Sequence, residues 1–388
     1  MSLSPTDFIK VANKTAEHFG FQTADKLKKQ QECKDCVVSL PHTVTGTNKR
    51  IDNHAGLLCS GLTTFCDEKL HALEKPVLLY SIEQTPRTGE PAVTFHIFNV
   101  KKSIAEAILI QVSRALANEL GYTDHTVRIN SLGDKDSLAR YTRELTNYLR
   151  KRLDAMPPNA RELMKEHAIS ALADLINQEH ELGFRSPNPL EFLSDQSRKH
   201  FREIIEYLDM SETPYEIDPK MMAHHECYSD AIFSIDLHSE DDDEIPLVIR
   251  GGRFDEFVHR NTQTDTPAAG AVITLKNTKT PARLPRSKAQ NPSVYVVHLG
   301  FGPKIRSLLL IDTLRQAGIP VIHDLASDSL SSQLRDAEAR GIRYAIIIGQ
   351  KEFVENTVIF RDIQERNQEF ITEDSLLRRL KRRSGVTA

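Results

Sequence analysis

The chain has 388 residues, of which 39% are hydrophobic, so it can form the cores of two or three domains. Its formal net charge of -4 excludes a general attraction for phosphate, so nucleic acid could bind only to a local basic patch. The five cysteines are odd in number and thinly spread, which indicates free thiols and not a disulfide framework.

The N-terminal sequence lacks the basic and then apolar pattern of a secretion signal, and no run of about eighteen apolar residues could span a bilayer. We therefore expect a cytoplasmic protein with no membrane contact. Cys33 and Cys36 have the spacing of half a zinc site, but no second closely spaced pair follows them. We expect no metal site.

Residues Phe8–His18 carry apolar side chains at helical spacing, and the segment closes on a glycine, as a helix end does. The signal is weak from Lys28 to Glu74. Two runs rich in β-branched and aromatic residues, Val77–Ile82 and Val93–Val100, then predict an antiparallel hairpin. The apolar pattern of Ile104–Leu120 predicts a long amphipathic helix.

A short strand, "HTVRINS", follows that helix, and residues Ser137–Tyr207 are mostly helical and highly charged. The runs "AIFSIDL" and "IPLVIR" predict a second hairpin. The chain then reaches the pair Gly251 and Gly252, which predicts a turn through "RFD". Another apolar strand follows and ends at Lys276 and Asn277.

A linker rich in Pro, Lys and Asn precedes the last segment, in which strands and helices alternate. The strands "VYVVHLG", "IPVIHD" and "YAIIIG" enclose helices at Pro303–Ala317 and Ser329–Arg340. This βαβαβ order predicts a small, mostly parallel sheet covered by helices. The tail "SLLRRLKRR" predicts a closing basic helix.

The order of these segments resembles histidyl-tRNA synthetase, a class II aminoacyl-tRNA synthetase. The resemblance runs from about Lys75 to the end and rests on an ordered series that includes "YSIEQTPR", "FHIFNV", "RINSLGD", "GGRFD" and "TPAAG". It implies an α+β fold, in which a class II synthetase-like antiparallel sheet with a helical insertion precedes a C-terminal α/β anticodon-binding-like domain. The implied domains are a core at 1–136 and 210–282, the insertion at 137–209 and the last domain at 293–388. A homodimer with the first helix at its interface is also implied.

The catalytic motifs of that family are only partly retained. Activation of an amino acid by ATP needs fixed cations around the triphosphate. Arg87 matches the arginine of motif 2, but the family's following Tyr-Glu-Arg is Thr-Gly-Glu at 88–90. Asn277 replaces the terminal arginine of motif 3, and Lys276 before it should point to the opposite side of a strand. Ala223 aligns with the arginine of a segment specific to the histidine enzyme.

Arg87 is thus the only motif arginine retained, and no catalytic residue is assigned. The residues expected to line a ligand pocket are Arg87, His96, Glu226, Tyr228, Gly251, Gly252, Arg253 and Asp255. Arg253 could pair with Asp255 or another acid as support for the pocket floor, or it could contact a ligand. Asp52 aligns with a glutamate of a further family motif. ATP and Mg²⁺ are expected as cofactors only if activity remains.

The last domain keeps the apolar pattern of the family, but its net charge is only slightly positive. The candidate tRNA-binding cations are Lys304, Lys351, Arg378, Arg379, Lys381, Arg382 and Arg383. The basic tail could contact phosphate or only solvate the end of a helix. Bases would be read by loops near Phe301 and Lys351.

We therefore predict a catalytically degenerate, histidyl-tRNA synthetase-like protein that acts as a tRNA-binding or protein-binding regulatory factor. Two alternatives stay open. One is a divergent but active ATP-dependent histidine–tRNA ligase, and the other is a histidine-sensing regulatory subunit like that of ATP phosphoribosyltransferase. The family of that subunit usually lacks the anticodon-like domain, whereas this chain resembles the synthetase to its end.

Overall fold

The computed structural model describes residues 3–28, 53–73, 75–222, 227–238, 246–281 and 294–384. Predictions that concern Cys33, Cys36, Asp52, Ala223 and Glu226 lie outside these residues. Among the helices that are described, none is both long enough and apolar enough to cross a membrane.

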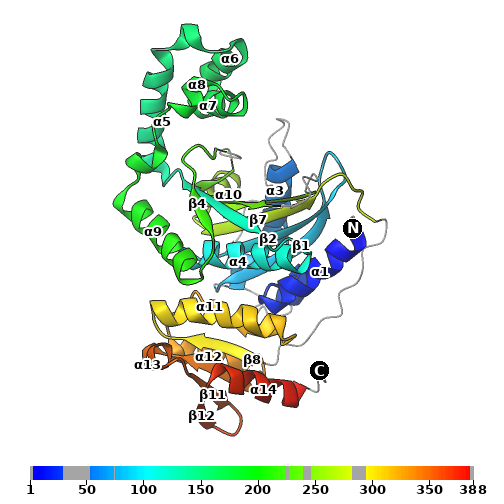
Figure 1. Cartoon of the computed structure of the whole chain (residues 1–388). Coiled ribbons are helices and arrows are strands. Elements are labelled where there is room, and N and C mark those ends of the chain that lie inside the picture. The colour runs from blue at the N-terminus through cyan, green and yellow to red at the C-terminus, as the bar shows by residue number, and fades with distance from the viewer. Residues whose placement is uncertain are drawn as a thin grey trace.

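A seven-stranded sheet forms the centre of the core (Figure 1). Its strands are β1 (Val77–Gln84), β2 (Pro91–Phe98), β3 (His125–Ser131), β4 (Tyr215–Ile217), β5 (Ser229–Leu237), β6 (Leu247–Arg253) and β7 (Ala268–Leu275). Their order is β1-β2-β7-β6-β5-β3-β4, and every neighbouring pair is antiparallel except β3 and β4. The two predicted hairpins, β1 with β2 and β5 with β6, are confirmed.

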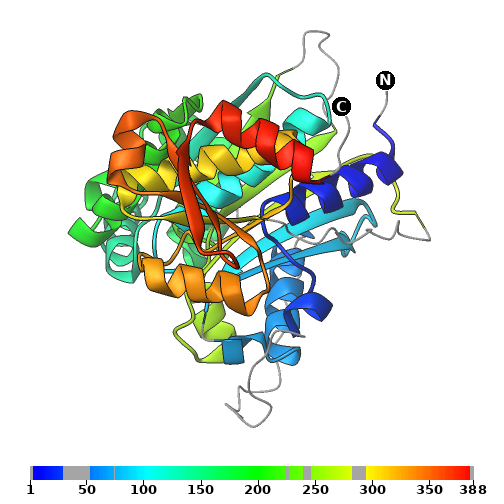
Figure 2. The ribbon, with the colours of Figure 1, turned by 90° about the horizontal axis from the view of Figure 1, so that it is seen from below.

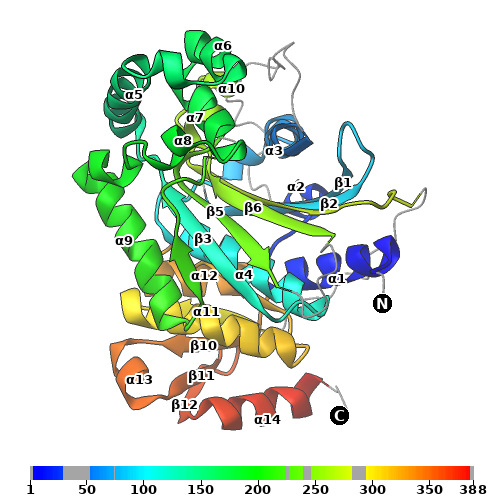
Figure 3. The same cartoon turned by 45° about the horizontal axis from the view of Figure 1, so that its top comes forward.

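Successive side chains of each strand point to opposite faces of this sheet. The helices of the core are α1 (Pro5–His18), α2 (Ala24–Lys28), α3 (Asn53–Asp67), α4 (Ile104–Glu119) and α10 (Asp255–Thr262), with a 3-10 turn at Leu70–Leu73. Phe95 and Ile273 pack toward α1 and α4, whereas Phe98 and Val272 pack toward α3 and α10. We call the two sides the α4 face and the α3 face, and Figures 1 and 3 show them on opposite sides of the sheet.

Gly251 and Gly252 lie inside β6, so the prediction that the strand ends at this pair is wrong. A Cβ on Gly251 would lie 2.4 Å from Cζ of Phe233, and one on Gly252 would lie 2.6 Å from the carbonyl oxygen of Ala231. Glycine is needed here because groups of β5 approach the strand closely. After Arg253 the chain passes directly into α10, which the sequence did not predict.

The predicted helical segment between β3 and β4 is confirmed. It contains α5 (Lys135–Arg150), α6 (Pro158–Glu166), α7 (Ala168–Asn177), α8 (Glu181–Phe184) and α9 (Asp195–Met210), with 3-10 turns at Leu153–Ala155 and Pro189–Phe192. Helices α5 to α8 share a core of their own, to which Tyr141 and Leu172 contribute, and they project from the body in Figure 1. Helix α9 returns to pack on α4.

The C-terminal domain has a five-stranded sheet in the order β12-β11-β10-β8-β9. Its elements are β8 (Val294–His298), α11 (Phe301–Gln316), β9 (Val321–His323), α12 (Leu330–Ala339), β10 (Tyr344–Ile348), α13 (Gln350–Glu355), β11 (Val358–Asp362), β12 (Asn367–Ile371) and α14 (Glu373–Ser384). The predicted βαβαβ unit is confirmed, with β8 parallel to β9 and to β10. Strands β11 and β12 add an antiparallel hairpin that the sequence did not predict.

The C-terminal domain packs on the helices that cover the α4 face of the core (Figure 2). Helix α11 packs on its own sheet and on α1, so apolar residues occur on more than one of its sides. Arg315 Nη1 lies 2.6 Å from Glu119 Oε1, and His323 Nε2 lies 2.9 Å from the carbonyl oxygen of Phe19. One apolar cluster continues through both domains.

Candidate functional site

The turn between β1 and β2 carries Arg87 in an exposed position. Glu90 closes this turn, because its backbone carbonyl accepts the N–H of Thr85 at 2.8 Å. The Glu90 side chain accepts the Thr88 hydroxyl at 2.6 Å and the backbone N–H of Asn277 at 2.9 Å. A carboxylate therefore ties together the two segments that resemble motifs 2 and 3.

Asn277 does not lie on a strand. Strand β7 ends at Leu275, and Asn277 occupies the following turn with a φ of +59°. Asparagine tolerates this left-handed conformation better than most residues because its short polar side chain can hydrogen-bond locally. The prediction that Lys276 and Asn277 alternate on a strand is therefore wrong.

His96 lies on the α3 face of β2 and is fully buried. Helix α3 touches it directly, since a Cβ added to Gly61 would lie 2.1 Å from Cε1 of the imidazole. The ring stacks on Phe98 at 5.8 Å and meets the Phe254 ring edge-on at 5.9 Å. Burial lowers the pKa of His96 to about 4. The imidazole is thus a neutral packing group at pH 7.

Tyr228 is 3% exposed, and its hydroxyl lies 2.6 Å from Nε2 of His54 in α3. This contact joins the first turn of α3 to the start of β5. Leu58 and Phe65 of α3 belong to the same apolar cluster as Tyr228 and Val272. The predicted pocket residues His96 and Tyr228 are brought to one face of the sheet, but there they are covered by α3.

A polar group remains on the α3 face beside this apolar cluster. Ser81 Oγ lies 2.5 Å from Glu83 Oε1 and 2.7 Å from Thr94 Oγ1. The role of Glu83 and the closure of the turn by Glu90 were not predicted from the sequence. Strand alternation from His96 through Thr94 would have placed Thr94 on this face. With Arg87 on the same turn, this end of the sheet contains two carboxylates beside one retained motif arginine.

Arg253 is 2% exposed and points to the α4 face, where it forms a bidentate pair with the fully buried Glu106. Its Nε and Nη2 atoms lie 2.7 and 3.0 Å from the two Glu106 oxygens. Nη1 donates to the Val100 carbonyl at 3.1 Å and lies 3.4 Å from Asp255 Oδ1. Glu106 is also 2.9 Å from Nε2 of His200 in α9. Arg253 therefore joins β6, α4 and, through Glu106, the insertion.

Charges inside this network shift its protonation. Burial alone would raise the pKa of Glu106, but Arg253 and His200 lower it to about 2. Burial opposes protonation of His200, but the Glu106 carboxylate raises its pKa overall. Burial raises the pKa of Asp255, whose Oδ1 accepts the Ala268 N–H at 2.7 Å. The predicted pocket residues Arg253 and Asp255 thus hold strands and helices together.

The candidate RNA-binding cations are divided between buried and exposed positions. Lys304 is 5% exposed, and its Nζ lies 2.9 Å from Asp328, so it supports the domain instead of offering an open charge. Lys351 is exposed, and its Nζ lies 5.6 Å from the centre of the Phe370 ring, which is 59% exposed.

In α14, Arg378 and Lys381 are exposed, whereas Arg379 pairs with Glu369 at 2.5 Å. The backbone of Arg382 and Arg383 lies in the same helix, and their side chains are outside the description. Across the residues that the structure describes, no group of three or more His, Cys, Asp and Glu side chains is arranged to hold a metal ion.

Comparisons with known proteins agree with this architecture. The anticodon binding domain family matches residues 295–383. The histidine–tRNA ligase of Thermosipho melanesiensis is 26% identical over 310 residues, which cover 78% of this chain and 72% of the relative. That of Bacillus velezensis is 25% identical over 316 residues, with coverages of 79% and 73%.

The chain is similar to histidine–tRNA ligases over more than three quarters of its length. This confirms the resemblance drawn from the ordered motifs, and with it the class II sheet and the anticodon-binding domain. The solved structure of apo S. aureus histidyl-tRNA synthetase is 16% identical, covers 83% of this chain and 82% of its own, and has a TM-score of 0.47. The family relationship leaves open which of its chemical steps this chain performs.

Proposed function

We propose that this chain is a non-catalytic member of the histidyl-tRNA synthetase family that binds tRNA through its C-terminal domain. The observation that carries the proposal is the position of α3. Its Gly61 touches the His96 imidazole, and its leucines and Phe65 pack on the sheet where the ligand pocket was expected. A nucleotide and an amino acid would have to displace a packed apolar helix to reach this surface.

Electrostatics at the end of the sheet support the same proposal. An activating site stabilises developing negative charge with cations that are already in place. Here Glu90 stands where the motif of the family has an arginine, and its carboxylate is held by the Asn277 backbone and the Thr88 hydroxyl. Arg87 is the one motif arginine that the sequence retains on this turn, so we expect the turn to hold a triphosphate less well than the arginine-rich motif of the family.

The tRNA-binding part of the proposal rests on the match to the anticodon binding domain and on exposed groups of that domain. Phe370 offers an aromatic surface on which an unstacked base could lie, and Lys351 is beside it. Arg378 and Lys381 on α14 offer exposed charges for phosphate. The name of the relatives, histidine–tRNA ligase, suggests tRNA as the RNA.

Charge reversal of α14 tests this binding. We expect the double variant Arg378→Glu and Lys381→Glu to lower tRNA affinity about tenfold or more at low salt, and to reduce the slope of log affinity against log salt by about two. Deleting the tail is a poorer test, because Leu376 and Leu380 of α14 are buried, so the deletion would also remove packing of the C-terminal domain. The measurement is a salt titration of the full chain with labelled tRNA.

The control variant Lys10→Glu and Arg260→Glu makes the same change of net charge at exposed sites outside the C-terminal domain. Unchanged affinity in the α14 variant, or an equal loss in the control, would remove α14 from the mechanism. Absence of binding by the full chain at low salt would contradict tRNA binding and leave a protein partner as the alternative.

We also propose a homodimer, but its interface cannot use the apolar side of α1. The apolar residues of α1, including Phe8 and Ile9, are fully buried inside the single chain. The outer side of α1 carries Asp7 and Lys10, which lie 3.8 Å apart. A second copy would therefore meet a charged side of this helix, or another part of the core.

A further inference from the structure

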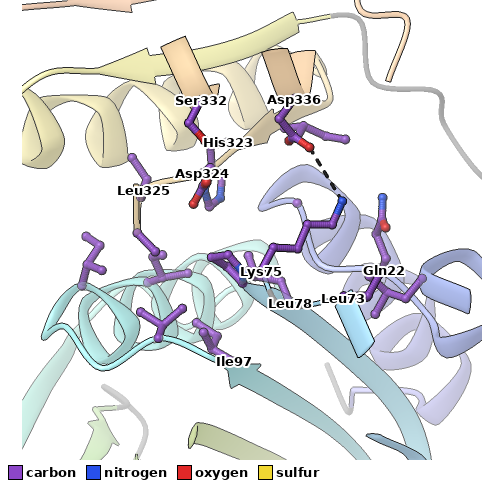
Figure 4. Close-up of a pocket in the computed structure, with 18 of the residues that line it drawn as sticks. Gln22, Leu73, Lys75, Leu78, Ile97, His323, Asp324, Leu325, Ser332 and Asp336 are labelled. Atoms are coloured by element: carbon purple, nitrogen blue, oxygen red, sulfur yellow. Dashed lines mark ion pairs between the residues drawn. The ribbon is translucent and has the colours of Figure 1, made fainter. Parts of the chain in front are cut away.

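A groove of about 280 Å³ lies where the insertion returns to the C-terminal domain. Its walls are the end of α9, the middle of α11, α13 and the start of α14. Figure 1 shows α9 above α11 and α13 below it, and the Tyr207 ring of α9 lies 5.0 Å from the Phe301 ring of α11. The groove is separate from the cavity in Figure 4, which lies between the core and α12 and is bridged at 3.8 Å by Lys75 and Asp336.

The surface of this groove is largely apolar. Met210 of α9 is 41% exposed and Leu309 of α11 is 36% exposed, and both line the groove together with the half-buried Phe353 of α13. Ile305 and Leu310 form its floor and are each only 1% exposed. Single exposed apolar side chains are common on protein surfaces, but apolar residues of three helices that share one groove indicate an interaction surface.

Contacts within the C-terminal domain hold the groove in shape. A Cβ added to Gly302 would lie 2.9 Å from Cε1 of Phe353, so this ring packs directly on the backbone of α11. Arg306 Nη1 donates to Asn356 Oδ1 at 3.1 Å, and its Nη2 lies 2.7 Å from Glu373 Oε1. Arg306 therefore fixes α11, α13 and α14 to one another. A groove that is already formed costs less to order when a ligand binds.

The charge at the edge of the groove is negative. Of the described residues that line it, Arg306 alone is cationic, and Glu373 compensates its charge. Glu206 is exposed one turn before the end of α9, and Asp209 is exposed in its last turn. The nearest cation on that helix, Arg202, lies a further turn back. An apolar groove with this edge repels the phosphates of nucleic acid and is complementary to a cationic protein surface.

We propose that this groove binds an amphipathic helix of a partner protein, with leucine-like side chains on its apolar side and lysine or arginine beside them. Apolar side chains one turn apart on such a helix enter the groove and pack on Leu309 and Phe353. The flanking cations face Glu206 and Asp209. Because α9 and the C-terminal domain both contact the partner, its binding stabilises their packing. The site does not depend on the proposed RNA binding.

Fluorescence anisotropy with a labelled amphipathic peptide of leucine and lysine tests the groove, using the full chain at physiological salt. One control peptide has the same composition with its leucines spread over all sides of the helix, and a second has glutamate in place of lysine. We expect saturable one-site binding of the first peptide, with both controls at least tenfold weaker. No saturable binding, or equal binding of either control, would overturn the proposal.

Polar substitution inside the groove locates the binding. The double variant Met210→Gln and Leu309→Gln changes exposed side chains, so it should keep cooperative thermal unfolding and bind the peptide at least tenfold more weakly. The control Leu153→Gln and Phe184→Gln makes the same change at apolar side chains of the insertion that are 39% and 54% exposed, and should leave the affinity unchanged. Unchanged affinity in the groove variant, or an equal loss in the control, would place the peptide elsewhere and reject the site.

Two further measurements on the groove variant distinguish the occupant. We expect its tRNA affinity and its mass by light scattering to equal those of the unmodified chain. A loss of tRNA affinity would assign the groove to RNA, and a lower mass would assign it to a second copy of this chain. Either result would overturn the proposal of a partner helix.

Discussion

Replacement of Arg253 by alanine is expected to lower the free energy of unfolding by about 3–5 kcal/mol. The variant leaves the fully buried Glu106 without its bidentate partner, and the carbonyl of Val100 loses its donor. Removing one member of a buried ion pair costs this much because the charge that remains is neither solvated by water nor compensated by its former partner. Urea unfolding followed by far-ultraviolet circular dichroism measures it, since the chain has no tryptophan.

Arg128→Ala is the matched control. Arg128 also pairs with two acids, Asp218 and Asp236, but its side chain is 39% exposed, so we expect a loss of about 1 kcal/mol or less. Equal stability of the Arg253→Ala variant and the unmodified chain would contradict the structural role. Such a result would favour the alternative interpretation, in which Arg253 contacts a ligand.

The same network predicts a pH dependence of stability with two limbs. Arg253 and His200 outweigh burial and lower the pKa of Glu106 from 4.5 to about 2, so its contribution is present above pH 4.5 and is lost as the pH falls toward about 2. Glu106 outweighs burial and raises the pKa of His200 above 6.5, so that contribution is present below pH 6.5 and is lost as the pH rises through the raised value.

Urea unfolding across this pH range distinguishes the limbs. Glu106→Gln should flatten the acid limb, and His200→Gln should flatten the limb above pH 6.5. His259→Gln is the control, because His259 is 49% exposed and its partner Asp265 is also exposed, so the pair contributes little to stability. A His200→Gln variant that keeps the full decline above pH 6.5 would show that another group causes it.

Elements with a strong apolar signal were predictable from the sequence. The strands β2 and β8 are continuous runs rich in β-branched and aromatic residues, and helix α1 repeats its apolar residues with the helical period. Helix α3 was missed because its residues "NHAGLLCSGLTTFCD" include several glycine, serine and threonine residues of low helix propensity. The hairpin of β11 and β12 was missed because β12 is an edge strand with mostly exposed or half-buried residues.

The chemistry of single residues was less predictable, because it depends on partners far apart in the chain. The sequence left open whether Arg253 supports the fold or binds a ligand, and its main partner Glu106 is 147 residues away. The charge of Lys304 looked available until the fold brought Asp328 to it. The replacement of the motif arginine by Asn277 could be predicted from the sequence alone, because the order of the motifs is sufficient to align this position.

Amino-acid-dependent exchange between ATP and pyrophosphate tests the central claim most directly, with an active histidine–tRNA ligase as the positive control. Loss of one charge-stabilising contact costs about 10²–10³ in rate, so the substitutions at Glu90 and Asn277 predict exchange at least about 10⁴-fold below that control. We expect no exchange above background with any amino acid, and no further change in Arg87→Ala. Histidine-dependent exchange at the rate of the control, abolished by Arg87→Ala, would contradict the account.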